Sequence, residues 1–130
     1  MKQWVLVALP LAAGGCLFAA AGAGAGGGIY FNDRGVGSVV TVPVSRASSA
    51  TEQTFQELGI GQKKTTTEQD GTTDKREIQG STSDRDVTVS IQTEGTGSRI
   101  NVVARKSAVT WDKDFARTIL QRIVKLCANS

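Results

Sequence analysis

Cys16 is the residue whose setting most clearly indicates chemistry, because it follows a short apolar run and four small residues. Lys2 precedes the apolar residues 4–11, and Ala12-Ala13-Gly14-Gly15 lead directly to the cysteine. A cationic start, a short apolar stretch and small residues before a cut are typical of a secretory signal peptide. A cysteine placed at the cut can accept a lipid. The pattern predicts that residues 1–15 are removed and that Cys16 is acylated.

The same stretch admits two alternatives to lipidation. The third residue before the cysteine is Ala13, where leucine is usual at a lipoprotein cleavage site. Ordinary signal cleavage after Ala21-Gly22-Ala23 or Ala23-Gly24-Ala25 would release a soluble periplasmic protein that lacks Cys16. Without cleavage, residues 4–25 are long enough to cross a bilayer core of about 30 Å as a helix that rises about 1.5 Å per residue.

Histidine is absent from the sequence, which narrows the chemistry open to its folded part. Ser-His-Asp and Cys-His catalysis, histidine-based metal sites and the usual proton shuttle at neutral pH all need this residue. Asp112 and Asp114 are too close in sequence to face each other across a substrate, and they fit the start of a helix. Turn contexts account for the other candidate carboxylates, which are Asp70, Asp74, Asp84 and Asp86. We therefore predict no enzymatic activity, no catalytic residue, no metal and no cofactor.

Several side chains are candidates for binding rather than catalysis. Trp111 is either a binding aromatic or a cover for the edge of the core beside a helix start. Four basic residues can share an open sheet face, either to meet an anionic lipid or glycan or as a solvated surface: Lys63, Lys64, Arg99 and Arg105. Cys127 lies in the last turn of a predicted helix, and we expect it to be buried. An intermolecular disulfide and a reactive thiol are the alternatives for Cys127.

Length and charge indicate one domain without a nucleic-acid partner. Removal of residues 1–15 from the 130-residue sequence leaves 115 residues, the size of one common domain. One lysine is lost with that segment, so 14 basic residues remain against 12 acidic ones. Acids are interspersed among the basic residues, whereas nucleic acid requires a basic face. Residues 16–28 are rich in Gly and Ala and predict a flexible tether, and residues 29–130 form the domain.

Hydrophobic periodicity assigns the first elements of this domain. Val40, Val42 and Val44 alternate with other residues, which predicts a strand that lies at an edge or ends at the intervening proline. A helix follows, with Ser45 as its N-cap and Gly59 just after its end. Two further strands are expected over residues 60–69 and 76–82, with Asp70-Gly71 as the turn that ends the first of them.

The second half of the domain shows the clearest pattern. Residues 87–92 and 100–105 alternate apolar and polar side chains on either side of a glycine-rich turn, which predicts a hairpin. A closing helix is expected after Thr110 as its N-cap, with an apolar stripe of Phe115, Ala116, Ile119, Leu120, Ile123, Val124 and Cys127. The order strand, helix, four strands, helix predicts an α+β domain of two layers. We expect this domain to contain an antiparallel sheet of about five strands, with both helices packed on one face of the sheet.

These features resemble a family of small, mainly proteobacterial lipoproteins that contain a domain of unknown function. The resemblance covers about residues 10–127 and rests on Cys16 before the Gly/Ala tract and on three further segments. The segments are Phe55-Gln56-Glu57-Leu58-Gly59-Ile60, Asp86-Val87-Thr88-Val89-Ser90-Ile91, and Trp111-Asp112-Lys113-Asp114-Phe115-Ala116 leading to Ile119-Leu120-Gln121-Arg122-Ile123. The resemblance implies a signal, a lipid site at Cys16 and a compact α+β domain, with no assigned activity. The element order also resembles, more loosely, the helix-grip domains of outer-membrane assembly lipoproteins.

The predicted function depends on the anchor more than on the domain. We expect a non-enzymatic cell-envelope lipoprotein, held to a membrane by acyl chains on Cys16, whose domain contacts other envelope proteins. Leu17, rather than an aspartate, follows the cysteine and favours the outer membrane, facing the periplasm. The alternative is a periplasmic carrier that holds an apolar ligand between sheet and helices. A void of about 300 Å³ or more between the two layers would favour the carrier.

Overall fold

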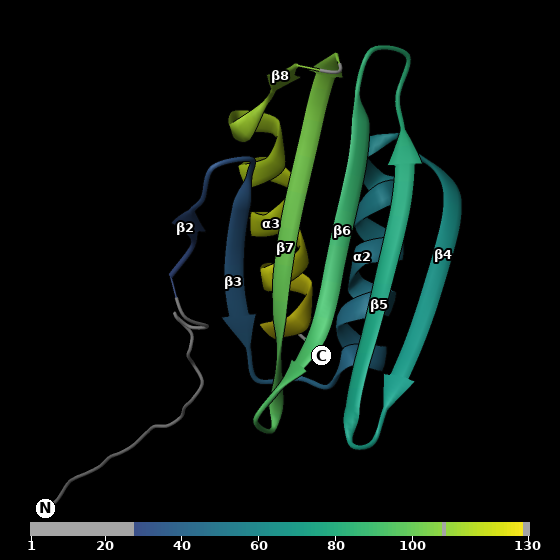
Figure 1. Cartoon of the computed structure of the whole chain (residues 1–130). Helices are drawn as coiled ribbons and strands as arrows, with labels where there is room; N and C mark the ends of the chain where they lie inside the picture. The colour runs from purple at the N-terminus through teal and green to yellow at the C-terminus, as the bar shows by residue number, and fades with distance from the viewer. Residues whose placement is uncertain (1–27, 108, 129–130) are drawn as a thin grey trace, which may run out of the picture.

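Two helices cover one face of a seven-stranded antiparallel sheet in the part of the chain that the structure describes, residues 28–107 and 109–128 (Figure 1). The structure is a computed structural model. The predicted two-layer α+β class, with both helices on one face, is confirmed, and the sheet has more strands than expected. The predicted signal, the lipid site at Cys16 and nearly all of the tether lie outside the described residues.

The strands lie in the order β2-β3-β7-β6-β5-β4, and β8 pairs with β7 beside the start of β3. Their bounds are β2 (Tyr30–Phe31), β3 (Val36–Val40), β4 (Gly61–Asp70), β5 (Thr73–Ser81), β6 (Asp86–Glu94), β7 (Gly97–Ser107) and β8 (Thr110–Trp111). The helices are α2 (Val44–Leu58) and α3 (Lys113–Ala128). Figure 1 shows α3 behind β3 and β7 and α2 behind β6 and β5, in agreement with their packing contacts. Neither helix is both long and apolar enough to cross a membrane.

The central hairpin β6–β7 has the predicted period of two. Val89 pairs with Val102 and Ile91 pairs with Ile100, and all four side chains are fully buried under the helices. We call the helix-covered face the inner face and the opposite one the outer face. Because successive side chains of a strand point to opposite faces, the residues between these four lie on the outer face. The predicted hairpin is therefore confirmed.

The beginning of α2 corrects two predictions. Strand β3 ends at Val40, so Val42 and Val44 do not extend it, and Val44 instead begins the helix. Pro43, not Ser45, occupies the N-cap position, with φ −70° and ψ 166°, and no side chain caps the helix. The carbonyl of Pro43 accepts the first helical hydrogen bonds from the N–H groups of Arg46 and Ala47, each at 3.0 Å. A proline fixes φ and has no N–H to lose, which suits it to a helix start more than to a strand.

The end of α2 follows the prediction. Gly59 adopts the left-handed conformation at φ 70°, which glycine accepts without the steric cost of a Cβ. The N–H of Ile60 donates to the carbonyl of Phe55 at 2.8 Å, a Schellman-type closure. Three buried hydroxyls of the helix donate to carbonyls four residues earlier, each at 2.8 Å: Ser48, Thr51 and Thr54. These internal bonds allow a helix with a modest apolar stripe to pack against the sheet.

The start of α3 also differs from the prediction. Thr110 belongs to β8 and does not cap the helix. Asp112 takes this role, because its Oδ1 accepts the N–H of Phe115 at 3.0 Å, while its Oδ2 accepts the Nε of Arg85 at 2.9 Å. Arg85 lies in the loop between β5 and β6, so one carboxylate joins this loop to the helix. The backbone bond to Phe115 and then the bond to Arg85 lower the pKa of Asp112.

Cys127 is buried as predicted, with 5% of its surface exposed, in the last turn of α3. Loss of solvation raises the pKa of its thiol to about 11. The thiolate is the nucleophilic form of cysteine, so this thiol is poorly reactive near neutral pH. The two helices are also joined at their surface, where Arg122 of α3 donates to Glu57 of α2 at 2.8 Å.

Substitution of Asp112 tests the cap. Asp112→Ala should lower the free energy of unfolding by about 1 kcal/mol through loss of the cap, while Asp112→Asn keeps a capping oxygen and loses the charge. Because the folded state lowers the pKa of Asp112, its charge contributes stability that is complete at neutral pH and is lost as the pH falls below about 4.

Urea unfolding at several pH values measures both effects. The stability difference between the native protein and Asp112→Asn should shrink on acidification, whereas the deficit of Asp112→Ala should persist in part. A pH-independent difference for Asp112→Asn would contradict the assigned ionic role.

Candidate interaction surface

Large apolar side chains are exposed along one edge of the sheet. Within the described residues, four such side chains are exposed: Tyr30 (38%), Phe31 (54%), Val109 (80%) and Trp111 (38%). All four belong to β2, to β8 or to the turn that leads into β8. Exposed aromatics along one edge of a small domain mark a candidate contact surface.

Trp111 lies on the outer face and contacts an arginine from a distant part of the chain. It pairs with Arg105 of β7, and the guanidinium carbon of Arg34 lies 6.0 Å from the centre of its ring. A cation over the face of a tryptophan is attracted by the ring quadrupole. By this register Trp111 lies on the face opposite the buried core, and Arg34 packs against its ring.

Arg34 is positioned by the tight turn between β2 and β3. The Oδ1 of Asn32 accepts the N–H of Arg34 at 3.1 Å and the N–H of Gly35 at 2.8 Å, and the N–H of Asn32 donates to the carbonyl of Gly35 at 3.0 Å. Gly35 itself is buried against β7, where a Cβ would collide with the carbonyl of Val102. The turn can therefore approach β7 closely enough to bring Arg34 over Trp111.

Tyr30 forms a second aromatic–arginine contact on the same face. Its ring covers Gly37, where a Cβ would lie only 2.6 Å from the ring. Its hydroxyl accepts Nη1 of Arg99 at 2.8 Å, and Arg99 also donates to both carboxylate oxygens of Glu94. We call Tyr30, Arg34 and Trp111 the aromatic corner. By register, Tyr30 lies level with Asn101 and Trp111 level with Arg105, so the two rings are about 13 Å apart along β7.

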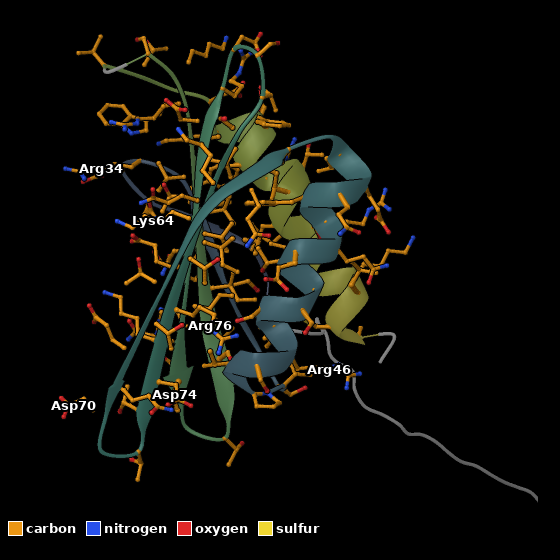
Figure 2. The ribbon with its side chains drawn as sticks, turned by 90° about the vertical axis from the view of Figure 1, so that its right-hand side faces the viewer. Arg34, Arg46, Lys64, Asp70, Asp74 and Arg76 are labelled. Atoms are coloured by element: carbon orange, nitrogen blue, oxygen red, sulfur yellow. The ribbon has the colours of Figure 1, made fainter. Side chains whose placement is uncertain are left out.

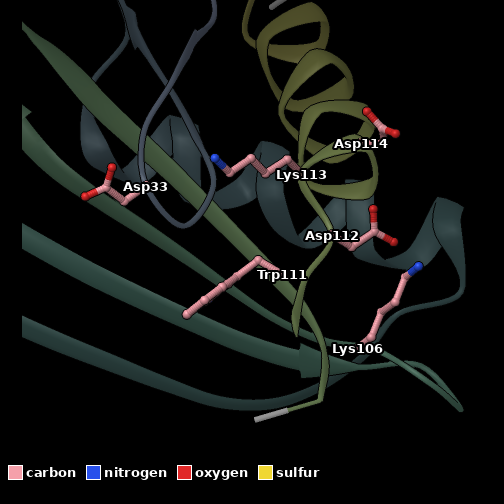
Figure 3. Close-up of a pocket in the computed structure, with 6 residues that line it drawn as sticks. All are labelled: Asp33, Lys106, Trp111, Asp112, Lys113 and Asp114. Carbon is pink, nitrogen blue, oxygen red and sulfur yellow. The ribbon is translucent and has the colours of Figure 1, made fainter. Parts of the chain in front are cut away.

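A hollow of about 420 Å³ opens beside Trp111, where β8 leads into α3 (Figure 3). Its lining residues are Asp33, Lys106, Trp111, Asp112, Lys113 and Asp114. The lining combines three carboxylates, two ammonium groups and one indole ring, and Figure 3 shows Asp112, Asp114 and Lys106 on the other side of the chain from the Trp111 ring. Asp112 is already engaged by Phe115 and Arg85, so Asp33, Asp114 and the two lysines are the charged groups left to contact a partner. No group of three carboxylate, thiol or imidazole side chains in the described residues is placed to hold a metal ion.

The other predicted carboxylates do not join this hollow. Asp70 and Asp74 lie near the turn between β4 and β5, at the far tip of the sheet from Arg34 (Figure 2). Asp84 forms an ion pair with Arg85 at 2.9 Å. Asp84 and Asp86 line a neighbouring groove of about 210 Å³ with residues of the same loop and of β7.

The basic residues expected on the open face are brought together only in part. By register, Lys64, Arg99 and Arg105 lie on the outer face, and Figure 2 shows Lys64 and Arg34 pointing away from the helices. Lys63 falls at a register irregularity of β4. Acidic residues occupy the same face: Glu68, Glu77, Asp86 and Glu94. The outer face therefore alternates in charge and does not form the basic patch that an anionic surface would select.

Sequence reasoning identified Trp111 but missed Tyr30 and Arg34. The turn signal Asn32-Asp33-Arg34-Gly35 between Tyr30-Phe31 and Val36 could have indicated the hairpin. The contact with Trp111 could not be derived, because it depends on β8 and the β2–β3 turn meeting beside β7. No protein-family model matches this sequence, and no curated protein matches it.

Proposed function

We propose that this chain is a non-enzymatic lipoprotein of the bacterial cell envelope, anchored by acyl chains on Cys16, whose domain binds another envelope protein through the aromatic corner. The outer membrane, facing the periplasm, is the proposed location. The observation that carries the proposal is the placement of Trp111, exposed beside a hollow and held there by Arg34.

The composition of the aromatic corner supports protein binding. Tryptophan, tyrosine and arginine are the residues most enriched among the energetically dominant positions of protein interfaces. Each ring of the corner already contacts an arginine, Arg34 for Trp111 and Arg99 for Tyr30, so little side-chain freedom is left to lose on binding. The mixed charges that line the hollow beside Trp111 suit the polar rim of such an interface.

The proposed anchor brings this surface close to the membrane. Residues 17–28 separate Cys16 from Ile29, and a fully extended chain of this length reaches about 45 Å. A partner of the aromatic corner would then lie in or near the same membrane.

Two further observations support a binding role over a catalytic role and over the carriage of an apolar ligand. The Asp112 carboxylate is engaged as a cap and ion-pair partner, and the Cys127 thiol is buried with a raised pKa, so both have structural roles. Between the layers, Ile78, Ile100 and Leu120 are fully buried. The hollows described above lie outside this core, which supports the binding role over an apolar-ligand carrier.

Substitution of the lipid site tests the anchor. Cys16→Ser should release the protein from the membrane fraction, because acyl chains on this sulfur are its proposed hold, while Cys127→Ser should remain membrane-bound. Fractionation of the envelope with immunoblotting measures the release, and the intact mass of the native protein shows where the chain starts. Unchanged retention of Cys16→Ser, or a native mass that equals the full precursor, would contradict lipidation.

Site-specific crosslinking tests the aromatic corner. A photoreactive amino acid in place of Trp111 should yield a discrete protein adduct in intact cells, whereas the same group at the exposed Gln56 of α2 should not. Arg34→Ala in the same background should weaken the adduct, because Arg34 belongs to the proposed binding surface. Equal adducts from both positions, or none from position 111, would rule out the corner as the binding surface.

A further inference from the structure

Strand β4 is a long edge strand on the side of the sheet opposite the aromatic corner. Within the described residues it pairs with β5 alone, and nine of its ten residues are exposed. A row of unpaired backbone N–H and carbonyl groups along such an edge is a template for another strand. The other edge is occupied by the two short strands β2 and β8, which leave no comparable template there.

The register of β4 identifies which of its backbone groups face outward. The N–H of Asp74 in β5 donates to the hydroxyl of Thr93 in β6, and that hydroxyl lies 3.4 Å from the carbonyl of Asp74. Both backbone groups of Asp74 therefore face β6, so its partner Gln69 directs its own groups away from β5. The direction of the backbone groups alternates along a strand, so those of Thr67 and Thr65 also point away from β5. Gln69, Thr67 and Thr65 therefore offer backbone hydrogen bonds at the free edge.

The side chains of β4 carry opposite charges in its two halves. Lys63 and Lys64 lie in the first half, and Glu68 and Asp70 in the second. In a parallel arrangement of two such strands in register, like charges would meet, which is destabilising. In an antiparallel arrangement the basic half of one strand meets the acidic half of the other.

We propose that β4 pairs antiparallel with β4 of a second copy of this chain, about a two-fold axis at Thr66. This register places Lys64 opposite Glu68 of the second copy, and the symmetry repeats the pair. Lys64 and Glu68 lie on the same face of the sheet, opposite Gln79 and Lys75 of β5, so the new ion pairs form on the outer face. Thr65 comes opposite Thr67 of the second copy, and both direct their backbone groups to the shared edge.

The fold leaves room for this pairing. Helix α2 lies behind β5 and β6 while β4 runs beside it, and Thr65 and Thr67 on the inner face of β4 are exposed (Figure 1). The irregularity between Gln62 and Lys64 ends the regular part of the strand, so the symmetric pairing centres on residues 64–68. The product is one continuous antiparallel sheet through both copies, with an interface in which the same surface is used twice.

Cysteine crosslinking of the full-length protein in intact cells tests the axis. Thr66→Cys should form a disulfide-linked dimer with copper phenanthroline, because residue 66 faces itself across the axis. Asp70→Cys is the matched control on the same strand and face, and the register separates the two copies of residue 70 by about 27 Å. Equal yields from the two variants, or no dimer from Thr66→Cys, would overturn the proposal.

Charge reversal tests the register. In the Thr66→Cys background, Lys64→Glu and Glu68→Lys should each lower the disulfide yield several-fold, since each places like charges opposite one another. The combined variant restores opposite charges and should recover the yield. A combined variant no better than the single ones would overturn the proposed register. These outcomes do not depend on binding at the aromatic corner. If that proposal is wrong, only the photocrosslinking result at position 111 changes.

Discussion

Burial of the inner face of β6 and β7 beneath the two helices is the interaction on which the rest of the structure depends. Val89, Ile91, Ile100 and Val102 form a fully buried square at the centre of the sheet. Removal of such side chains from water is the main favourable term in folding. Because a strand alternates its faces, this burial also determines that the intervening side chains are presented on the outer face.

The two surfaces proposed for binding therefore lie at the margins of the domain, outside its core. The aromatic corner lies at one edge, where β2, β8 and the start of α3 meet, and β4 lies at the other. A protein partner at the corner and a second copy at β4 would therefore not compete. In a lipid-anchored protein, confinement to one membrane raises the effective concentration for both contacts.

Strict alternation made the β6–β7 hairpin predictable, and glycine chemistry made Gly59 and Gly71 predictable, both with positive φ. The starts of the helices were not, because Ser45 is a better capping residue than Pro43, and Thr110 is a capping residue that lies only two positions before Asp112. The two-residue strands β2 and β8 are too short to show a period, and their pairing follows from the fold. The sequence alone made Trp111 a candidate for binding. Arg34 became a candidate only once the structure placed the β2–β3 turn beside β8.

Two substitutions on β7 test most directly the claim that the space between sheet and helices is a filled core. Ile100→Ala should lower the free energy of unfolding by about 2–5 kcal/mol, the usual cost of such a cavity, since Ile100 is fully buried. Val103→Ala, on the outer face of the same strand, should cost about 1 kcal/mol or less. Equal losses for the two variants would contradict this account, because a loosely filled interior of the kind that an apolar-ligand carrier needs would tolerate Ile100→Ala.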